Sequence, residues 1–149
     1  MNSRHAKLNE RVAVILLAED SEELGTLMEQ ALERDGHKVV RVEDGSELGD
    51  YLSLTREKRW SVPVPDLLIT DLRMPGRSGL QALHAARNAG LSFPAILVTA
   101  FPDHEVGAQA EALGAKLIPK PLDLDELRGA VRALLLNLFG PDAEGERRS

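Results

Sequence analysis

The sequence predicts a three-layer α/β sandwich in which helices cover both faces of a parallel β-sheet. Short runs of continuous apolar residues recur along the 149 residues, and segments with helical periodicity lie between them. Continuous rather than alternating apolarity is typical of strands covered on both faces, as in parallel sheets. Strand and helix alternate five times, and this order favours right-handed crossovers between parallel strands.

Five apolar runs predict strands, and an amphipathic helix follows the first of them. The predicted strands span 12–17, 67–69, 95–98 and 116–118, with a weaker run at 38–42. A helix is expected to begin near Ser21, because serine is a good N-cap and two glutamates follow it where the helix dipole favours anions. Its apolar residues form one stripe: Leu24, Leu27, Met28, Ala31 and Leu32.

Glycines mark where three predicted helices end. Gly36, Gly90 and Gly114 each follow a helical segment and precede an apolar run, which is typical of a left-handed C′ residue. The helix before Gly114 is expected over about 103–113. A last helix is expected from about Asp123 to Gly140, with its stripe at Leu124, Leu127, Val131, Leu134 and Leu138.

The predicted domain covers residues 12–139. Residues 1–11 are expected to form a flexible N-terminal extension and residues 140–149 a flexible, polar C-terminal tail. The stretch 56–65 is too rich in proline and charge to continue either neighbouring element. Its Trp60 is interpreted as a hydrophobic anchor for that loop, with a partner contact as the alternative.

Composition narrows the classes of function. The chain has 24 acidic and 18 basic residues and a net charge of -6, which disfavours direct binding to nucleic acid. It has no cysteine, which excludes thiolate metal sites and cysteine nucleophiles. The apolar run that starts at Val12 is too short to span a bilayer, so we expect no membrane insertion and a cytoplasmic location.

Polar residues that can carry chemistry follow four of the predicted strands. Glu19 and Asp20 follow the first strand, Asp71 the third, Thr99 the fourth and Lys120 the fifth. The carboxyl ends of parallel strands meet at one edge of the sheet, where ligands bind. Carboxylates about 5 Å apart repel by roughly 3 kcal/mol at an effective dielectric near 20. The three acids therefore predict a cation among them, although each alone, Asp20 included, is more often a helix cap or loop residue.

An all-oxygen site with one lysine suits Mg²⁺ better than zinc, and Mg²⁺ suggests a phosphate ligand. In that setting Asp71 is the best candidate nucleophile, because it stands alone and is followed by an exposed turn over 74–79. Lys120 would hold a phosphoryl oxygen, and Thr99 would donate its hydroxyl.

Four motifs carry a resemblance to a known family. They are A-E-D-S at 18–21, D-L-R-M-P-G-x-x-G at 71–79, T-A at 99–100 and K-P at 120–121. Together they resemble the receiver domain of two-component response regulators over about residues 12–139. The resemblance implies a flavodoxin-like sheet in the order 2-1-3-4-5 and a cis Lys120-Pro121 peptide bond.

The resemblance also implies roles for these residues. Asp71 would be the phosphorylated aspartate, Glu19 and Asp20 would hold Mg²⁺ with Asp71, and the backbone carbonyl of Arg73 would complete the metal's protein ligands. Thr99 would be the switch hydroxyl and Lys120 the phosphate-contacting lysine. The implied partners are a histidine kinase or phosphotransfer protein and a downstream effector protein.

Leu117 departs from the usual receiver pattern, and the last helix carries a second feature that bears on the output. Leu117 stands where receivers usually have an aromatic switch residue, so we expect movement of Thr99 to act through packing around Leu117 and the helix at about 103–113. On the last helix, Leu135, Leu136 and Phe139 add apolar surface beyond the core stripe. That surface is either a docking or homodimer face or part of a wide core face.

The function expected is a regulatory phosphoacceptor switch rather than an enzyme with a separate substrate. One alternative is a constitutive pseudo-receiver, which binds partners without being phosphorylated. Another is a Mg²⁺-dependent phosphohydrolase with an aspartate nucleophile, which would need an acid two residues after Asp71, where Arg73 stands. Both a stand-alone receiver and the receiver part of a longer regulator fit the sequence.

Overall fold

The computed structural model describes residues 12–57 and 62–139, and strands and helices alternate throughout them. The predicted N-terminal extension, Trp60 and the C-terminal tail lie outside the described residues. The elements are β1 (Val14–Ala18), α2 (Glu22–Arg34), β2 (Lys38–Val42), α3 (Gly45–Arg56), β3 (Leu67–Asp71), α4 (Gly79–Asn88), β4 (Ala95–Thr99), α5 (His104–Ala112), β5 (Ala115–Pro119) and α6 (Leu124–Phe139).

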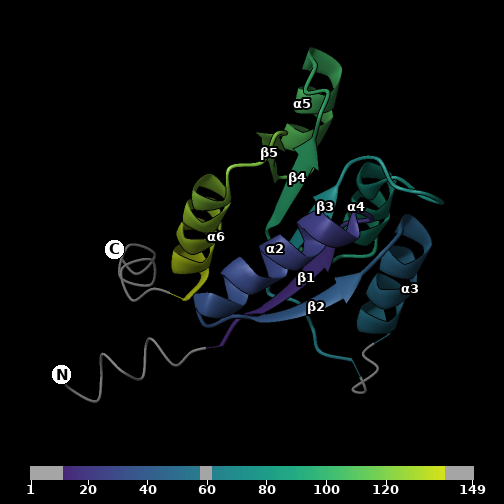
Figure 1. Ribbon diagram of the computed structural model, residues 1–149. Helices are drawn as coiled ribbons and strands as arrows, with labels where there is room; N and C mark the ends of the chain where they lie inside the picture. The colour runs from purple at the N-terminus through teal and green to yellow at the C-terminus, as the bar shows by residue number, and fades with distance from the viewer. Residues whose placement is uncertain (1–11, 58–61, 140–149) are drawn as a thin grey trace, which may run out of the picture.

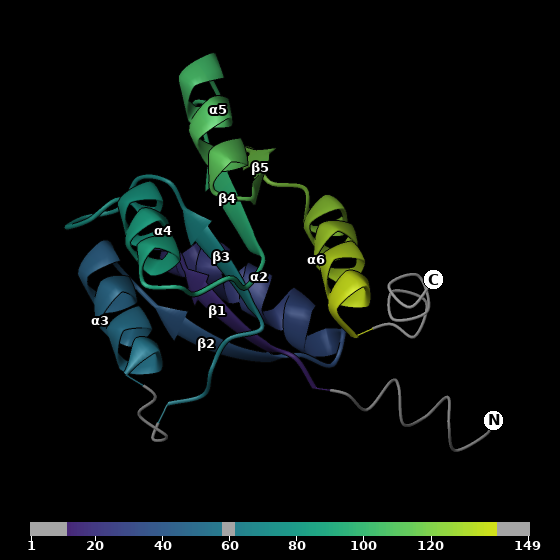
Figure 2. The same cartoon turned by 180° about the vertical axis from the view of Figure 1, so that it is seen from behind.

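The strands form one parallel sheet in the order β2-β1-β3-β4-β5, which confirms the predicted flavodoxin-like topology. Figure 1 and Figure 2 show helices on both sides of this sheet. Helices α2 and α6 pack on one face, and α3, α4 and α5 contribute to the core on the other. The order reverses between β1 and β3, so the loops that follow these two strands meet at the carboxyl edge.

Strands β3 and β4 are buried along their whole length. Every residue of β3 and of β4 is buried, which explains the continuous apolar runs in the sequence. The side chains alternate between two cores: Ile69 and Ile96 enter the core beneath α2 and α6, and Leu68 and Leu97 enter the opposite one. Each such side chain contributes about 1.5–3 kcal/mol when it is removed from water.

Strands β3, β4 and β5 are longer than the apolar runs that predicted them. Strand β3 continues through Asp71, which pairs in register with Val98, and β4 continues through Thr99. Asp71 and Thr99 are therefore the last residues of strands, whereas Glu19, Asp20 and Lys120 lie in the loops that follow β1 and β5. Sheet pairing holds the backbones of Asp71 and Thr99 in place.

The expected helix ends are confirmed. The Ser21 hydroxyl accepts a hydrogen bond from the Leu24 N–H at 3.2 Å and caps α2. Gly36, Gly90 and Gly114 have φ angles of 97°, 89° and 70°, the left-handed conformation predicted for them. Asp123 caps α6, since its Oδ1 accepts from the Glu126 N–H at 3.2 Å.

One expectation about a helix face was wrong. Leu27 is 47% exposed and does not belong to the buried stripe of α2. At about 100° per residue it lies well away from the buried face that carries Met28 and Leu32. On α6, Leu135 is buried in the core, as the wide-core alternative predicts, whereas Leu136 is 59% exposed. No helix in the described part of the chain is long and apolar enough to cross a bilayer.

Candidate functional site at the carboxyl edge of the sheet

Three carboxylates converge where the sequence places them together. Glu19 follows β1 directly, Asp20 comes next, and Asp71 ends the central strand β3. One oxygen of each carboxylate lies within 4.8 Å of the others. Glu19 and Asp71 are buried and Asp20 is exposed, so this acidic pocket is open to solvent on the side of Asp20.

Lys120 supplies the positive charge in this pocket. Its Nζ donates a hydrogen bond to Asp71 Oδ2 at 3.0 Å and lies 3.7 Å from Glu19 Oε1. The Lys120 N–H donates to the Thr99 carbonyl at 2.8 Å, which extends the β4–β5 pairing into the loop that carries the lysine. The Lys120-Pro121 peptide bond is cis, as the resemblance implied.

The buried Glu19 carboxylate is only partly satisfied. Its Oε2 accepts a hydrogen bond from the Ser21 N–H at 3.0 Å, but its Oε1 has no hydrogen-bond partner within the described residues. A buried charged oxygen without a partner is costly, because its hydration is lost and not replaced. This oxygen faces the space between the three acids and the lysine, where a cation would satisfy it.

The pKa values of the ionisable side chains at the site reflect their burial and the charges beside them. Burial raises the pKa of Glu19 above the ordinary range, the Ser21 N–H opposes that rise, and the Asp71 charge adds to it. Burial also raises the pKa of Asp71, against the opposing hydrogen bond from Lys120. Burial alone would lower the pKa of Lys120, but attraction to Asp71, Glu19 and Asp20 outweighs it and the pKa is raised.

The donor set fits a hard divalent cation. Three carboxylates and one ammonium leave the described pocket with excess negative charge, and its unsatisfied ligand atom is a buried oxygen. Oxygen ligands of this kind are those that Mg²⁺ and Mn²⁺ prefer, and no thiolate is present in the chain. The acidic pocket is therefore suited to a divalent metal ion.

Thr99 and Arg73 lie beside the pocket, the first at the end of β4 and the second in the loop after β3. Thr99 is buried at the end of β4, and its Oγ1 accepts a hydrogen bond from the Phe101 N–H at 3.1 Å. The Arg73 guanidinium lies over the exposed Phe101 ring, 5.5 Å from its centre. This contact joins the loop after β3 to the loop after β4.

Two glycines allow close packing of the turn after Asp71, and the sequence did not indicate this role for either of them. A Cβ on Gly79 would overlap the Asp71 carbonyl oxygen, and a Cβ on Gly45 would overlap the Arg77 carbonyl oxygen. The Gly45 N–H donates to the Pro75 carbonyl at 3.0 Å, so the start of α3 supports this turn. Gly79 belongs to the motif at 71–79. Gly45 lies 26 positions before Asp71 in the sequence, and only the packing shows that it too allows a close approach to this turn.

Comparison with known proteins agrees with this geometry. Residues 15–132 match the response regulator receiver domain. Response regulator protein PmrA of Pseudomonas aeruginosa is 37% identical over 129 residues, which make up 85% of this chain and 54% of that protein. Response regulator RppA of Synechocystis is 35% identical over 121 residues, 80% of this chain and 49% of that protein. The chain spans about half the length of the curated relatives it matches.

Solved structures share the fold. A response regulator receiver protein from Sinorhizobium medicae superimposes with a TM-score of 0.71 at 25% identity, covering 84% of this chain and 95% of that one. The Mn²⁺-bound form of response regulator Rcp1 superimposes with a TM-score of 0.68 at 23% identity, covering 87% and 96%. The family match, the sheet order and the acidic pocket agree, and the chain belongs to the response regulator receiver domain family.

Proposed function

We propose that this chain is a phosphoacceptor switch of a two-component phosphorelay, in which Asp71 receives a phosphoryl group and the change alters protein contacts. The observation that carries the proposal is the placement of Asp71. It is buried at the end of the central strand, hydrogen-bonded to Lys120 and within 4.8 Å of two further carboxylates. Receiver domains interact with histidine kinases, so a histidine kinase or phosphotransfer protein is the proposed donor.

The proposed metal site uses the acidic pocket and the turn after it. Glu19, Asp20, Asp71 and the backbone carbonyl of Arg73 would hold Mg²⁺, and Glu19 Oε1, which is buried and accepts no hydrogen bond from the described residues, supports this assignment. When bound, the ion would neutralise charge on the transferring phosphoryl group. The chain's own residues position that group and receive it.

The transfer itself is a substitution at phosphorus. A carboxylate oxygen of Asp71 attacks, a P–O bond forms, and the bond from phosphorus to the donor histidine nitrogen breaks, with its electron pair leaving on the imidazole. Lys120 now donates to Asp71 Oδ2 and would turn to a phosphoryl oxygen. The Thr99 hydroxyl would donate to another phosphoryl oxygen while it still accepts the Phe101 N–H.

Movement of Thr99 is the proposed start of the output. Leu117 stands on β5 in register with Leu97 of β4, and it is half-buried against the same core as Leu113, the C-cap residue of α5. A leucine cannot swing a ring between buried and exposed positions. We therefore assign the readout to repacking of α5 and β5, which would present a changed surface to a downstream effector protein.

The position two residues after Asp71 bears on the alternatives. There Arg73 is exposed and lies over Phe101, so this position provides no carboxylic acid to activate water. A phosphoryl group on Asp71 would then be hydrolysed slowly, which suits a regulatory phosphoacceptor better than a phosphohydrolase. The pseudo-receiver alternative has no specific support, because all five predicted site residues are present and four lie in ionic contact or within 4.8 Å of one another.

The domain boundaries and the oligomeric state belong to this proposal too. We propose residues 12–139 as the receiver domain, in the cytoplasm. The dimer predicted through the last helix now depends on Leu136, because Leu135 is in the core and the Phe139 side chain is not among those described. Light scattering of the wild type and Leu136→Glu before and after phosphorylation would test it; a monomer in every state would remove the dimer from the account.

The test of the switch is a comparison of amide spectra before and after treatment with acetyl phosphate and Mg²⁺. The expected shifts are concentrated in α5, β5 and the end of β4, and Thr99→Ala should lose most of the α5 and β5 shifts while it is still phosphorylated. A matched control is Thr26→Ala on α2, on the opposite face of the sheet. If Thr99→Ala reproduces the wild-type shifts, the proposed output route is wrong.

A further inference from the structure

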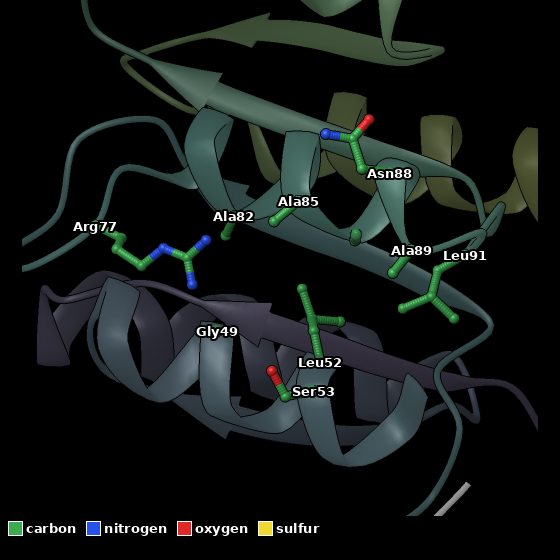
Figure 3. A pocket seen from close by; sticks show the side chains of 10 residues that line it. Gly49, Leu52, Ser53, Arg77, Ala82, Ala85, Asn88, Ala89 and Leu91 are labelled. Carbon is green, nitrogen blue, oxygen red and sulfur yellow. The ribbon is translucent and has the colours of Figure 1, made fainter. Parts of the chain in front are cut away.

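A hollow lies between α3 and α4, separate from the acidic pocket. It has a volume of about 460 Å³, within the range of roughly 300–1,000 Å³ that is typical of small-molecule sites. None of the acidic-pocket residues lines it. Figure 3 shows the side chains around it, which come from the middle of α3, the length of α4 and the loops at both ends of α4.

The walls of this groove are mostly apolar, and Ser53 and Asn88 are their uncharged polar members. Leu52 from α3 and Leu91 from the loop after α4 face it, and α4 presents alanines toward it (Figure 3). Successive alanines three and four positions apart lie on one face of a helix, and their small side chains leave space that larger residues would fill. These alanines are Ala82, Ala85, Ala86 and Ala89.

One charge enters this apolar space. The Arg77 side chain extends into the groove toward α3, as Figure 3 shows, and within the described residues it has no ion pair or side-chain hydrogen bond. Gly49 makes room for it, because a Cβ at that position would overlap an Arg77 guanidinium nitrogen. A glycine inside a helix costs about 1 kcal/mol relative to alanine, so α3 carries a local cost at the residue that accommodates the guanidinium.

The groove is electrostatically unlike the rest of the chain. The molecule has a net charge of -6, yet no acidic residue is among those that line this groove. Arg77 is exposed, and a guanidinium without a partner beside apolar side chains attracts a carboxylate and can bind it through two parallel hydrogen bonds. Apolar walls on either side favour an aliphatic or aromatic body attached to that carboxylate.

We propose that the groove between α3 and α4 is a binding site for a small amphipathic carboxylate, with Arg77 holding the carboxylate and Leu52 and Leu91 contacting the apolar body. Arg77 belongs to the same turn that follows Asp71, and Gly45 binds that turn through Pro75. A ligand at Arg77 thus contacts the segment that carries the phosphoacceptor. The binding itself does not depend on the phosphorylation proposed above.

The test is an amide-detected titration of the unphosphorylated, metal-free protein with octanoate. The expected shifts concentrate on α3, α4 and the turn at 74–79. Octan-1-ol and octylamine, which have the same chain length without the negative charge, should bind at least tenfold more weakly. Arg77→Gln and Gly49→Ala should each weaken octanoate binding at least tenfold, since one removes the guanidinium and the other displaces it.

Arg132→Gln is the matched control, because it removes one exposed arginine from α6 and should leave the affinity unchanged. Circular dichroism and a thermal melt establish that the variants are folded. Octanoate that fails to shift the groove residues, or that binds Arg77→Gln as well as the wild type, would overturn the proposal. Octan-1-ol bound as tightly as octanoate would overturn it too, because the guanidinium would then have no role.

Discussion

At the scale of single residues, the site could be located in advance because it depends on topology. In a parallel sheet, the carboxyl ends of the strands share one edge, so Glu19, Asp20 and Asp71 had to meet once the strands were assigned. Their hydrogen bonds could not be predicted, because rotamers and burial depend on neighbours distant in sequence. Nothing in the sequence indicates that Glu19 Oε1 accepts no hydrogen bond from the described residues while Oε2 accepts one from the Ser21 N–H.

Glu19→Gln tests whether this partly satisfied carboxylate holds a metal. The substitution removes one of three crowded negative charges, and the raised pKa of Glu19 indicates that its ionised form is disfavoured in the metal-free fold. We expect the metal-free variant to be more stable by about 1 kcal/mol and to bind Mg²⁺ at least tenfold more weakly. Urea unfolding with a chelator and calorimetric titration measure the two quantities.

The matched control for that experiment is Glu22→Gln, which removes an exposed carboxylate three residues further on, in the first turn of α2. It should leave Mg²⁺ affinity within about twofold of the wild type. Unchanged affinity in Glu19→Gln would show that the carboxylate is not a ligand.

At the scale of elements, the sequence predicted where helices begin and end better than which residues they bury. Caps are local, so Ser21 and Gly36 could be recognised from neighbouring residues alone. The buried face is set by the partner element, which explains why Leu27 was wrongly assigned and why the two alternatives for Leu135 could not be separated. Gly79 and Gly107 illustrate the same limit. Gly79 begins α4 and Gly107 lies within α5, but only Gly79 is crowded by neighbouring atoms, and the sequence does not distinguish them.

Gly79→Ala and Gly107→Ala should have opposite effects on stability. A Cβ on Gly79 would overlap the Asp71 carbonyl and lie 2.7 Å from Thr70 Oγ1, and overpacking of this kind costs about 1–3 kcal/mol. A Cβ on Gly107 in α5 meets nothing within 4 Å, so alanine there should stabilise by about 0.5–1 kcal/mol. Chemical denaturation compares them; equal changes would contradict the packing described at Asp71.

The link between α2 and α6 should make stability depend on acid pH. The Arg128 guanidinium donates to both oxygens of Asp35, at 2.9 and 2.8 Å, and lowers the pKa of that carboxyl. Because the folded pKa is depressed, this contribution is fully present above the unfolded pKa near 3.8 and is lost as pH falls through the lower, folded value.

The measurement is the difference in unfolding midpoint between the wild type and Asp35→Asn across pH 3 to 7. This range starts below the unfolded pKa of Asp35 and ends well above it. The wild type should be the more stable at pH 7, and the difference should shrink toward pH 3. Asp125→Asn removes the other, exposed partner of Arg128 and should change little. A difference that is constant with pH would mean that the ion pair contributes nothing.

At the scale of the whole molecule, burial differs between the strands of the sheet. The apolar runs in the sequence reflect this difference for the strands but not for the helices. The fully buried strands β3 and β4 gave clear apolar runs, while β2 at the edge is only half-buried and gave the weak run at 38–42. Helix α5 buries Ala110 alone among its residues, so it is held less firmly than the other helices. The sheet thus fixes Asp71, and the loosely packed α5 beside Thr99 is free to change its position.

The most direct test of the account is the intact mass of the chain after incubation with acetyl phosphate and Mg²⁺, beside Asp71→Asn, the exposed control Asp50→Asn and a chelator-treated sample. We predict that the wild type and Asp50→Asn gain the mass of one phosphoryl group, and that Asp71→Asn and the chelated sample gain none. An unmodified wild type, or equal labelling of Asp71→Asn, would contradict the claim that Asp71 is a metal-dependent phosphoacceptor.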